Sequence, residues 1–349
     1  AGLACAEAQH AQGRVVEAER LLVDLQAKAA TSEERARVAL MRANNLLRGL
    51  GRSEEALQVV CEAETSVTEP RWRDEFALLR AAAALNPGRP VEALDAAGSV
   101  LARAGAHELT TLNAVIATVA ALVLRGRTSE AIAAADGKLR LLGGADAEVS
   151  LYVDQLFTLR LLAQRLDGRL GEAEDVGLAR YQLLLNQRAD DLRATCAFAL
   201  GEVALARGAL QTAVRRLRES LLLLREHGRV FGIQGLSWCL GSLAQAAAMA
   251  GDVTLAEETL IEFDRVTPTD FYIPIDELAR AWVAVLSGNV VKGQSLALQA
   301  ARRAAERGND GIEAVALHDA ARLGASKTVA ARLAELATCA QGRLAPAYA

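Results

Sequence analysis

Apolar residues recur at intervals of three and four through most of the chain, which is the spacing of one face of an α-helix. Leu217, Leu221 and Leu224 show this spacing clearly. No long stretch alternates apolar and polar residues in the manner of a strand. The longest apolar run, residues 112–124, is too short to cross a membrane and is typical of a buried core helix. The pattern therefore predicts an all-α fold.

A ladder of glycines divides this helical pattern into units. The separations along the ladder are 38, 37, 38, 42, 40, 43, 37 and 36 residues, and its members are Gly13, Gly51, Gly88, Gly126, Gly168, Gly208, Gly251, Gly288 and Gly324. An alanine stands five positions after each of the first seven glycines, at Ala18, Ala56, Ala93, Ala131, Ala173, Ala213 and Ala256. A repeat of this period indicates a stack of similar structural units.

Each unit is predicted to be a helix, a tight turn and a second helix. The glycine supplies the left-handed backbone conformation that ends the first helix. Ser53 and Ser129 are predicted to cap the second helices of their units. The alanine is expected where the two helices cross, because a larger side chain would force them apart. The eighth unit has Gly293 at this position, and the ninth departs slightly, with Val329 and Ala330.

The glycine–alanine spacing resembles the tetratricopeptide repeat (TPR), with a period nearer 39 than the usual 34. Several units also carry a small residue seven positions before the glycine, namely Ala6, Ala81, Gly201, Ala244 and Ala281. The resemblance covers nearly the whole chain. It implies a right-handed superhelical solenoid of about nine TPR-like antiparallel helix pairs, and it says almost nothing about function.

No domain boundary is evident, so we predict one solenoid domain over residues 1–349. Bends are expected at Glu69–Pro70, Gly143–Gly144 and Thr267–Pro274, where prolines or glycines interrupt helices. The chain opens on Ala1 rather than methionine. We interpret it as a segment excised from a longer protein.

Composition narrows the classes of function. Hydrophobic residues make up 52% of the chain and aromatic residues only 4%, so Ala, Leu and Val supply most of the packing. The formal net charge is −4, which argues against direct nucleic-acid binding, since that needs clustered positive charge. The five cysteines are far apart and form no CxxC pair. They indicate neither a zinc site nor a disulfide framework, and a reducing cytoplasm fits them best.

Two short motifs could carry chemistry. Residues 288–295, GNVVKGQS, resemble a phosphate-binding loop but lack its lysine and its preceding strand, and they coincide with a repeat turn. His318 and Asp319 are adjacent on a predicted helix and so point about 100° apart. A polar contact between helices explains them better than a catalytic pair. We therefore predict no catalytic residue, no metal ligand and no cofactor.

The first helices of TPR pairs line a concave surface, so we expect a partner to bind there. Positions six and thirteen residues before the turn glycines are expected to point inward. The candidate contact set is Asn45, Asn113, Gln155, Glu202, Trp238, Gln245 and Trp282. A tryptophan in a groove makes a good anchor. An alternative is that Trp238 and Trp282 fill space between neighbouring repeats, which is common for buried tryptophan.

The last third of the chain resembles the segment that precedes the DNA-binding domain in large ATP-binding regulators of the LuxR type, common in actinobacteria. The residues that carry the resemblance are Ala281, Trp282, Gly288, Ala301, Ala305, Arg307, Gly308, Glu313, Ala316, Leu317, His318, Asp319, Arg322, Leu323 and Gly324. Members of that family resemble the maltose-operon activator in plan, with a STAND-class ATPase, a helical repeat region and a C-terminal helix-turn-helix. The resemblance implies that this chain is the repeat region alone.

Two hypotheses for the function follow. In the first, the chain is a non-catalytic domain of a transcriptional regulator that senses a small-molecule inducer or a protein partner. It would control the activity or self-association of flanking ATPase and helix-turn-helix modules, and homo-oligomers are compatible with it. In the second, it is a constitutive scaffold or adaptor that holds peptide segments of partner proteins. Neither hypothesis involves a membrane or direct contact with nucleic acid.

Overall fold

The computed structural model describes residues 2–67, 69–103, 105, 107–142, 147–227, 232–266 and 274–349. Within these residues the regular structure is entirely helical, which confirms the all-α prediction. The bends predicted at Gly143–Gly144 and over residues 267–273 lie outside the described residues. None of the described helices is both long enough and apolar enough to span a membrane.

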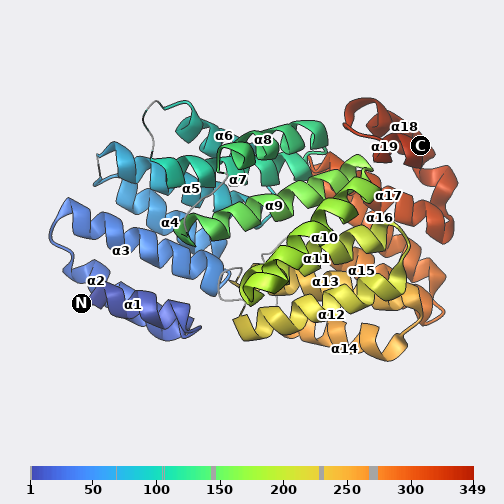
Figure 1. The fold of residues 1–349 in the computed structure, drawn as a ribbon, viewed down its shortest axis with the longest axis horizontal. Helices are drawn as coiled ribbons and strands as arrows, with labels where there is room; N and C mark the ends of the chain where they lie inside the picture. The colour runs from blue at the N-terminus through green and yellow to red at the C-terminus, as the bar shows by residue number, and fades with distance from the viewer. Residues whose placement is uncertain are drawn as a thin grey trace. The chain divides into compact units, whose positions relative to one another are not determined.

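The helices follow one another in pairs (Figure 1). The first four pairs are α1 (Gly2–Ala11) and α2 (Val15–Lys28), α3 (Ser32–Asn44) and α4 (Ser53–Glu64), α5 (Pro70–Leu85) and α6 (Pro90–Leu101), and α7 (Glu108–Leu124) and α8 (Thr128–Leu141). The next four are α9 (Ala147–Asp167) and α10 (Leu170–Gln187), α11 (Asp190–Ala206) and α12 (Leu210–His227), α13 (Gly232–Ala250) and α14 (Val253–Val266), and α15 (Pro274–Leu286) and α16 (Val290–Glu306). The last pair is α17 (Asp310–Ala320) and α18 (Ser326–Cys339), and a short α19 (Leu344–Tyr348) follows it.

Each of the nine predicted glycines joins the two helices of a pair. All nine have a positive φ, between 69° and 97°. At Gly126, for example, the glycine N–H donates to the Val123 carbonyl (3.1 Å) and the next N–H, of Arg127, donates to the Leu122 carbonyl (2.9 Å). This is the Schellman arrangement, which satisfies the last carbonyls of the first helix. In the second and ninth pairs, the first helix also ends in a π-helical segment, η1 (Asn45–Gly49) and η3 (Ala321–Ala325).

The predicted serine N-caps are wrong. Helix α4 begins at Ser53 itself, and Ser129 lies inside α8, one residue after its start. The N-cap positions are held by Arg52 and Arg127, neither of which makes a side-chain cap. Arg127 instead pairs with Glu130 in the first turn (2.5 Å). The helix starts earlier than predicted because the Schellman turn leaves only one residue between the glycine and the helix.

The residue five positions after the turn glycine lies at the helix crossing, as predicted. Ala18, Ala93, Ala131, Ala173, Ala213 and Ala256 are fully buried, and Ala56 is 2% exposed. Gly293 is the informative exception. A Cβ atom there would lie 2.8 Å from the Ala281 carbonyl oxygen and 2.5 Å from a Val285 methyl carbon. Helices α15 and α16 therefore approach too closely for even a methyl group, which explains why this unit carries glycine.

Hydrogen bonds link the turns of consecutive pairs. The Asn86 amide donates to the Ser53 hydroxyl oxygen (3.1 Å), and both residues are buried. The Thr128 hydroxyl donates to the Asp167 carboxylate (2.6 Å), again between buried residues. In both cases, the second residue after one turn glycine contacts the last residues before the next. The helix pairs are thus fixed to their neighbours at the turns as well as through their apolar faces.

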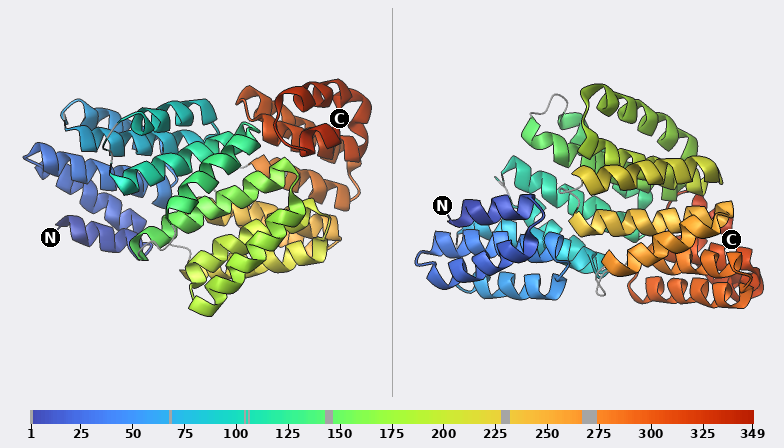
Figure 2. Two further views of the ribbon diagram at one scale, coloured as in Figure 1. Left: turned by 45° about the horizontal axis from the view of Figure 1, so that its top comes forward. Right: turned by 90° about the horizontal axis from the view of Figure 1, so that it is seen from below.

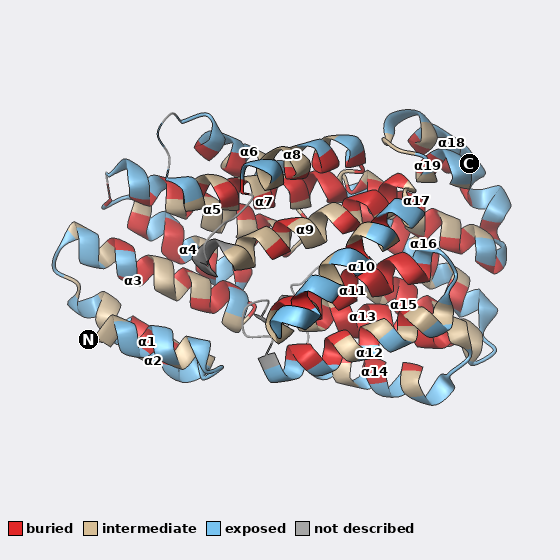
Figure 3. Ribbon diagram, viewed as in Figure 1, coloured by how far each residue is buried: buried red, intermediate tan, exposed pale blue. Residues whose placement is uncertain are grey.

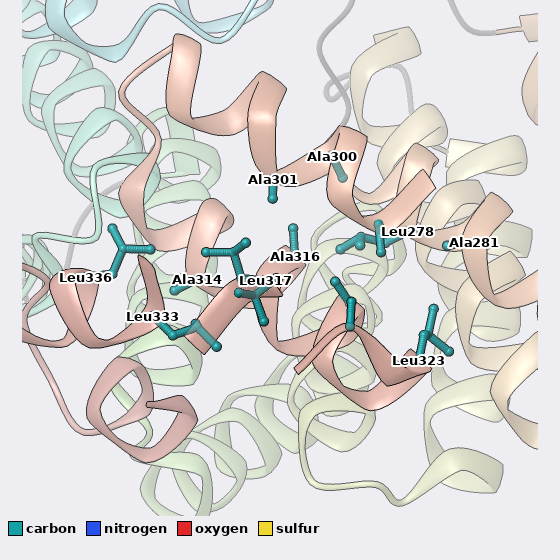
Figure 4. Packing of buried hydrophobic residues seen from close by; sticks show 14 of the residues in the cluster. Leu278, Ala281, Ala300, Ala301, Ala314, Ala316, Leu317, Leu323, Leu333 and Leu336 are labelled. Atoms are coloured by element: carbon teal, nitrogen blue, oxygen red, sulfur yellow. The ribbon is translucent and has the colours of Figure 1, made fainter. Parts of the chain in front are cut away.

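The chain falls into two compact units. Unit 1 contains the described residues up to Thr118, and unit 2 contains nearly all of those from Val119 onward. Each unit has its own buried apolar clusters, one around Leu46, Trp72 and Phe76 in unit 1 and another over α15 to α19 in unit 2 (Figure 4). The single domain predicted over residues 1–349 stays a prediction.

First and second helices differ in burial. Leu192 and all of residues 194–205 of α11 are buried, and most of α13 from Ser237 onward is buried too (Figure 3). Second helices keep one exposed side, as the exposed Leu222 of α12 and Ile261 of α14 show. Within each pair the two helices lie antiparallel in every view (Figures 1 and 2). The first helices of unit 2 thus form its interior layer.

Candidate functional site

Side chains from three successive first helices of unit 2 meet at one carboxylate, that of Asp319 on α17. Its Oδ2 accepts hydrogen bonds from Gln245 Nε2 on α13 (3.2 Å) and from Trp282 Nε1 on α15 (3.0 Å). Its Oδ1 accepts one from Arg322 Nη1 in η3 (3.1 Å). We call these four residues the Asp319 cluster. Two of them, Gln245 and Trp282, belong to the predicted contact set.

The repeat explains why these residues meet. Gln245 and Trp282 each stand six positions before a turn glycine, and Asp319 stands five positions before Gly324. Equivalent positions on successive first helices face the same side of the array. Because Gln245 reaches across the intervening pair to Asp319, the first helices α13, α15 and α17 converge tightly. The three helices are thereby linked through one carboxylate, and the concave binding surface stays a prediction.

The cluster is buried on one side and open on the other. Asp319 is 4% exposed and Gln245 6%, whereas the Arg322 side chain is 42% exposed. The Arg322 guanidinium lies over the Trp282 ring, 4.6 Å from its centroid. The three hydrogen bonds hold the Asp319 carboxylate in one orientation. The groups of the cluster that a partner can reach are the Arg322 guanidinium and the face of the Trp282 ring on which it lies.

An aromatic pair lies beside the cluster. The His318 and Tyr348 rings stack with 3.8 Å between centroids and 10° between planes. Burial lowers the pKa of His318, an effect that Asp319 opposes and Arg322 reinforces. Burial is also the main cause that raises the pKa of Tyr348, which lies within electrostatic range of Arg165, Asp319 and Arg322. The predicted polar contact between helices is confirmed for Asp319, whereas His318 makes an aromatic stack with Tyr348.

A second buried ion pair lies further along the first helices. Arg165 Nη2 of α9 is 3.3 Å from Glu202 Oε2 of α11, and their side chains are 13% and 3% exposed. Arg165 Nε and Glu202 Oε1 make no hydrogen bond. The predicted contact residue Glu202 is therefore held inside unit 2 by an arginine that the sequence pattern did not single out.

The two candidates in unit 1 hold the local structure together. Asn45 is fully buried and its amide donates to the Val15 carbonyl (3.0 Å) and to Glu19 (3.1 Å), while its Oδ1 lies 2.9 Å from His10 Nδ1. It has no exposed surface to offer a partner. Asn113 is partly buried, and its amide donates to the Leu109 carbonyl in its own helix (3.2 Å).

Gln155 on α9 and Trp238 on α13 are partly exposed. Together with Asn113 and Trp282, they are the members of the predicted set that keep surface available to a partner. Asp319, Arg322 and Arg165 were missed as site residues. Asp319 lies five residues before Gly324, one position away from the six-residue offset used for the prediction. The two arginines occupy no position that recurs from repeat to repeat.

Other chemistry is limited in the described part of the chain. No group of three His, Cys, Asp or Glu side chains is placed to hold a metal ion among the described residues. Burial raises the pKa of the Cys196 and Cys239 thiols to about 12, so neither is a thiolate near neutral pH. The phosphate-loop resemblance at residues 288–295 is a repeat turn, in which Asn289 Oδ1 accepts from the Lys292 N–H (3.0 Å) at the start of α16.

No protein-family model matches the chain, and no curated protein matches its sequence. Solved structures do match its fold. A Rap protein complexed with Competence and Sporulation Factor gives a TM-score of 0.58 at 12% identity, over 94% of this chain and 98% of that one. The apo form of RapI gives 0.50 at 11% identity, over 94% and 97%. The APC/C hetero-tetramer Cut9–Hcn1 gives 0.50 at 12% identity, over 97% and 76%. At such identities the likeness shows a shared TPR-like helical-repeat fold alone.

Proposed function

We propose that the chain is a non-catalytic repeat domain that binds a peptide segment of a protein partner. The observation that carries the proposal is the half-exposed stack of Arg322 on Trp282 above the buried Asp319. A large ring and a guanidinium held rigidly on three converging helices form an anchor of the kind that dominates protein interfaces. The fold neighbour solved with Competence and Sporulation Factor supports the proposal, because an array of similar fold accommodates a bound factor.

The chemistry of the stack defines the partner. Arg322 shares only one oxygen of Asp319 and is 42% exposed, so it has donors left for a carboxylate. The ring of Trp282 is partly exposed and suits an apolar or aromatic side chain beside that carboxylate. We expect a partner segment with an acidic residue next to an apolar one, with Trp238 and Gln155 as further contacts.

The proposal is tested by selecting binders from a random peptide library against the purified chain. We expect enriched peptides to share an acidic–apolar pair. Arg322→Gln should weaken their binding at least tenfold, about 1.4 kcal/mol, and Trp238→Ala should weaken it as well. The matched control is Arg302→Gln on the exposed side of α16, which should bind like wild type. Failure to enrich any peptide, or equal binding by the Arg322 variant, would refute the proposal.

We further propose that this binding domain is the sensor arm of a LuxR-type, STAND-class transcriptional regulator that works in the cytoplasm. The support is the resemblance over Ala281–Gly324. In that resemblance Ala281, Ala301, Leu317 and Asp319 are buried packing residues, and Trp282 and Arg322 are partly exposed. For the chain to act as a sensor, its ligand must bind one packing of the helix array more tightly than another. Light scattering on the chain with and without a metabolite pool tests this. Assembly on addition supports the regulator, and an unchanged monomer supports the scaffold alternative.

A further inference from the structure

The C-terminal residues Gln341–Tyr348, which we call the C-terminal clasp, return to two turns formed far earlier in unit 2. The Gln341 N–H donates to the Gly126 carbonyl (3.0 Å), and the Arg343 N–H donates to the Asp167 carbonyl (2.8 Å). The Gln341 side chain pairs in both directions with Glu130, 211 residues away. Its Oε1 accepts from the Glu130 N–H (3.2 Å), and its Nε2 donates to Glu130 Oε1 (2.8 Å).

The fit at Gly342 is close enough to require glycine. Gly342 has φ of 88°, and a Cβ atom there would lie 2.7 to 2.9 Å from atoms of Asp167. Asp167 cannot give way easily, because its carboxylate is also bound by Thr128 (2.6 Å) and Arg169 (2.7 Å). The clasp therefore packs backbone against a turn whose own side chains are already fixed.

The far end of the clasp is held by packing. Ala345 is 6% exposed, and the Tyr348 ring stacks on His318 of α17. The cavity left beneath α19, next to Leu166 and Val315, is about 10 Å³. That is room for about one water molecule, so the clasp fills the surface on which it lies.

An ordinary end cap does not account for these contacts. A terminal helix in a repeat array covers the last unit, and each unit contacts only its neighbours. The clasp does cover α17 and α18, but its polar contacts go to the α7–α8 and α9–α10 turns. These polar contacts consist of two main-chain hydrogen bonds and one amide side chain, and the Tyr348 ring adds a stack on His318 of α17. That is the division found in peptide recognition, where the main chain gives affinity and a few side chains give specificity.

We infer that the C-terminal clasp is an internal ligand of a peptide-docking surface, formed by the turns at Gly126 and Gly168 with Glu130 and His318, which a partner peptide can occupy in its place. The partner carries a Gln–Gly pair and an aromatic residue six positions after the glycine. This inference deepens the proposed function, on which it rests for the peptide nature of the partner. Because the clasp is tethered, its effective concentration is on the order of millimolar. A free peptide competes only when the clasp is weakened.

The test uses the full chain and a fluorescein-labelled peptide of residues 340–349, AQGRLAPAYA, followed by fluorescence polarisation. Gly342→Val should release the clasp, because the valine side chain collides with Asp167. We expect the dissociation constant for the peptide to fall at least tenfold relative to wild type. Tyr348→Ala provides a second release variant that does not strain the backbone, and it should show the same direction of change.

Two controls make the test specific. Gly251→Val strains an equivalent turn where a Cβ meets nothing within 4 Å, and it should bind the peptide as wild type does. A peptide with valine in place of its glycine should not bind any chain. Equal binding to wild type and both release variants, or no binding to either release variant, would overturn the inference. Neither result touches the Arg322-dependent selection, so the two proposals fail separately.

Discussion

The turns at Gly126 and Gly251 have the same local structure and different surroundings. Both glycines have positive φ, 69° and 84°, and both are followed five residues later by a fully buried alanine. A methyl group on Gly251 would meet nothing within 4 Å, whereas one on Gly126 would lie 3.0 Å from the Gly311 nitrogen. We call the first an open turn and the second a covered turn. The repeat sets the turn itself, and distant parts of the chain decide whether it is covered.

The largest expected difference comes from alanine at the two glycines. Gly126→Ala and Gly251→Ala both place a side chain in the left-handed region, at a cost of about 1–2 kcal/mol. Gly126→Ala adds overpacking against the Gly311 backbone, about 1–3 kcal/mol more. Urea unfolding followed by circular dichroism measures both. Equal losses of unfolding free energy would show that the α17 start moves away freely and that the turn is not truly covered.

The helix crossing should behave alike in both kinds of turn. Ala131→Leu, after the covered turn, and Ala256→Leu, after the open one, should each lower the free energy of unfolding by about 1–3 kcal/mol through overpacking. Ala330→Leu on the exposed side of α18 is the matched control and should change little. An unchanged melting midpoint for either buried alanine would contradict the assignment of these residues to the crossing. Ala173→Leu offers a third site for the same measurement.

Of the hydrogen bonds between turns, the one to a charged group should contribute more to the free energy of unfolding than the one between neutral groups. Thr128→Val removes a donor from the buried Asp167 carboxylate and should cost about 1.5–3 kcal/mol. Ser53→Ala removes a neutral partner from Asn86 and should cost about 0.5–1.5 kcal/mol. The comparison is made by chemical denaturation of the two variants. The reverse order would mean that Arg169 and the clasp satisfy Asp167 without Thr128.

The local fold was predictable from the sequence because its signals are local. A left-handed residue must follow each first helix, and only glycine adopts that conformation without strain, so nine glycines marked nine turns. The N-cap residues were misplaced by one position at Ser53 and by two at Ser129, because the Schellman turn leaves the cap positions to Arg52 and Arg127. Gly293 breaks the alanine pattern of the sequence, and only the close approach of α15 and α16 explains why.

The site was only partly predictable, because its partners are not periodic. The period placed Gln245 and Trp282 on the correct side of successive first helices. It could not show that a third helix brings Asp319 between them, because the radius at which the helices converge depends on packing along the whole array. No pattern links Gln341 to Glu130. A contact over such a separation depends on how the helix pairs between the two residues pack on one another.

The smallest expected effect depends on pH and is confined to the covered turns. The pKa of His318 is lowered by burial, so the folded chain disfavours the imidazolium relative to the unfolded chain. No difference arises well above the ordinary value of about 6.5. As the pH falls below it, the unfolded chain binds the proton first and stability is lost until the lower, folded pKa is reached.

Amide hydrogen exchange at pH 7 and pH 5, corrected for intrinsic rates, should show this loss in the clasp and at Gly126 and Gly168, with Gly251 unaffected. His318→Phe keeps the stack on Tyr348 and should remove the pH dependence. A loss that persists in this variant would assign the pH dependence to a group other than His318.

The clasp also bears on how unit 2 folds. In an open repeat array each helix pair contacts only the pairs next to it in sequence, and unfolding can begin at either end. The pairing of Gln341 with Glu130 closes a loop of 211 residues, whose entropy must be lost before the contact stabilises anything. Such long-range contacts raise the contact order and slow folding. We expect unit 2 to complete its helix pairs first and to dock the clasp last, so that residues 341–348 become ordered only once every pair before them is in place.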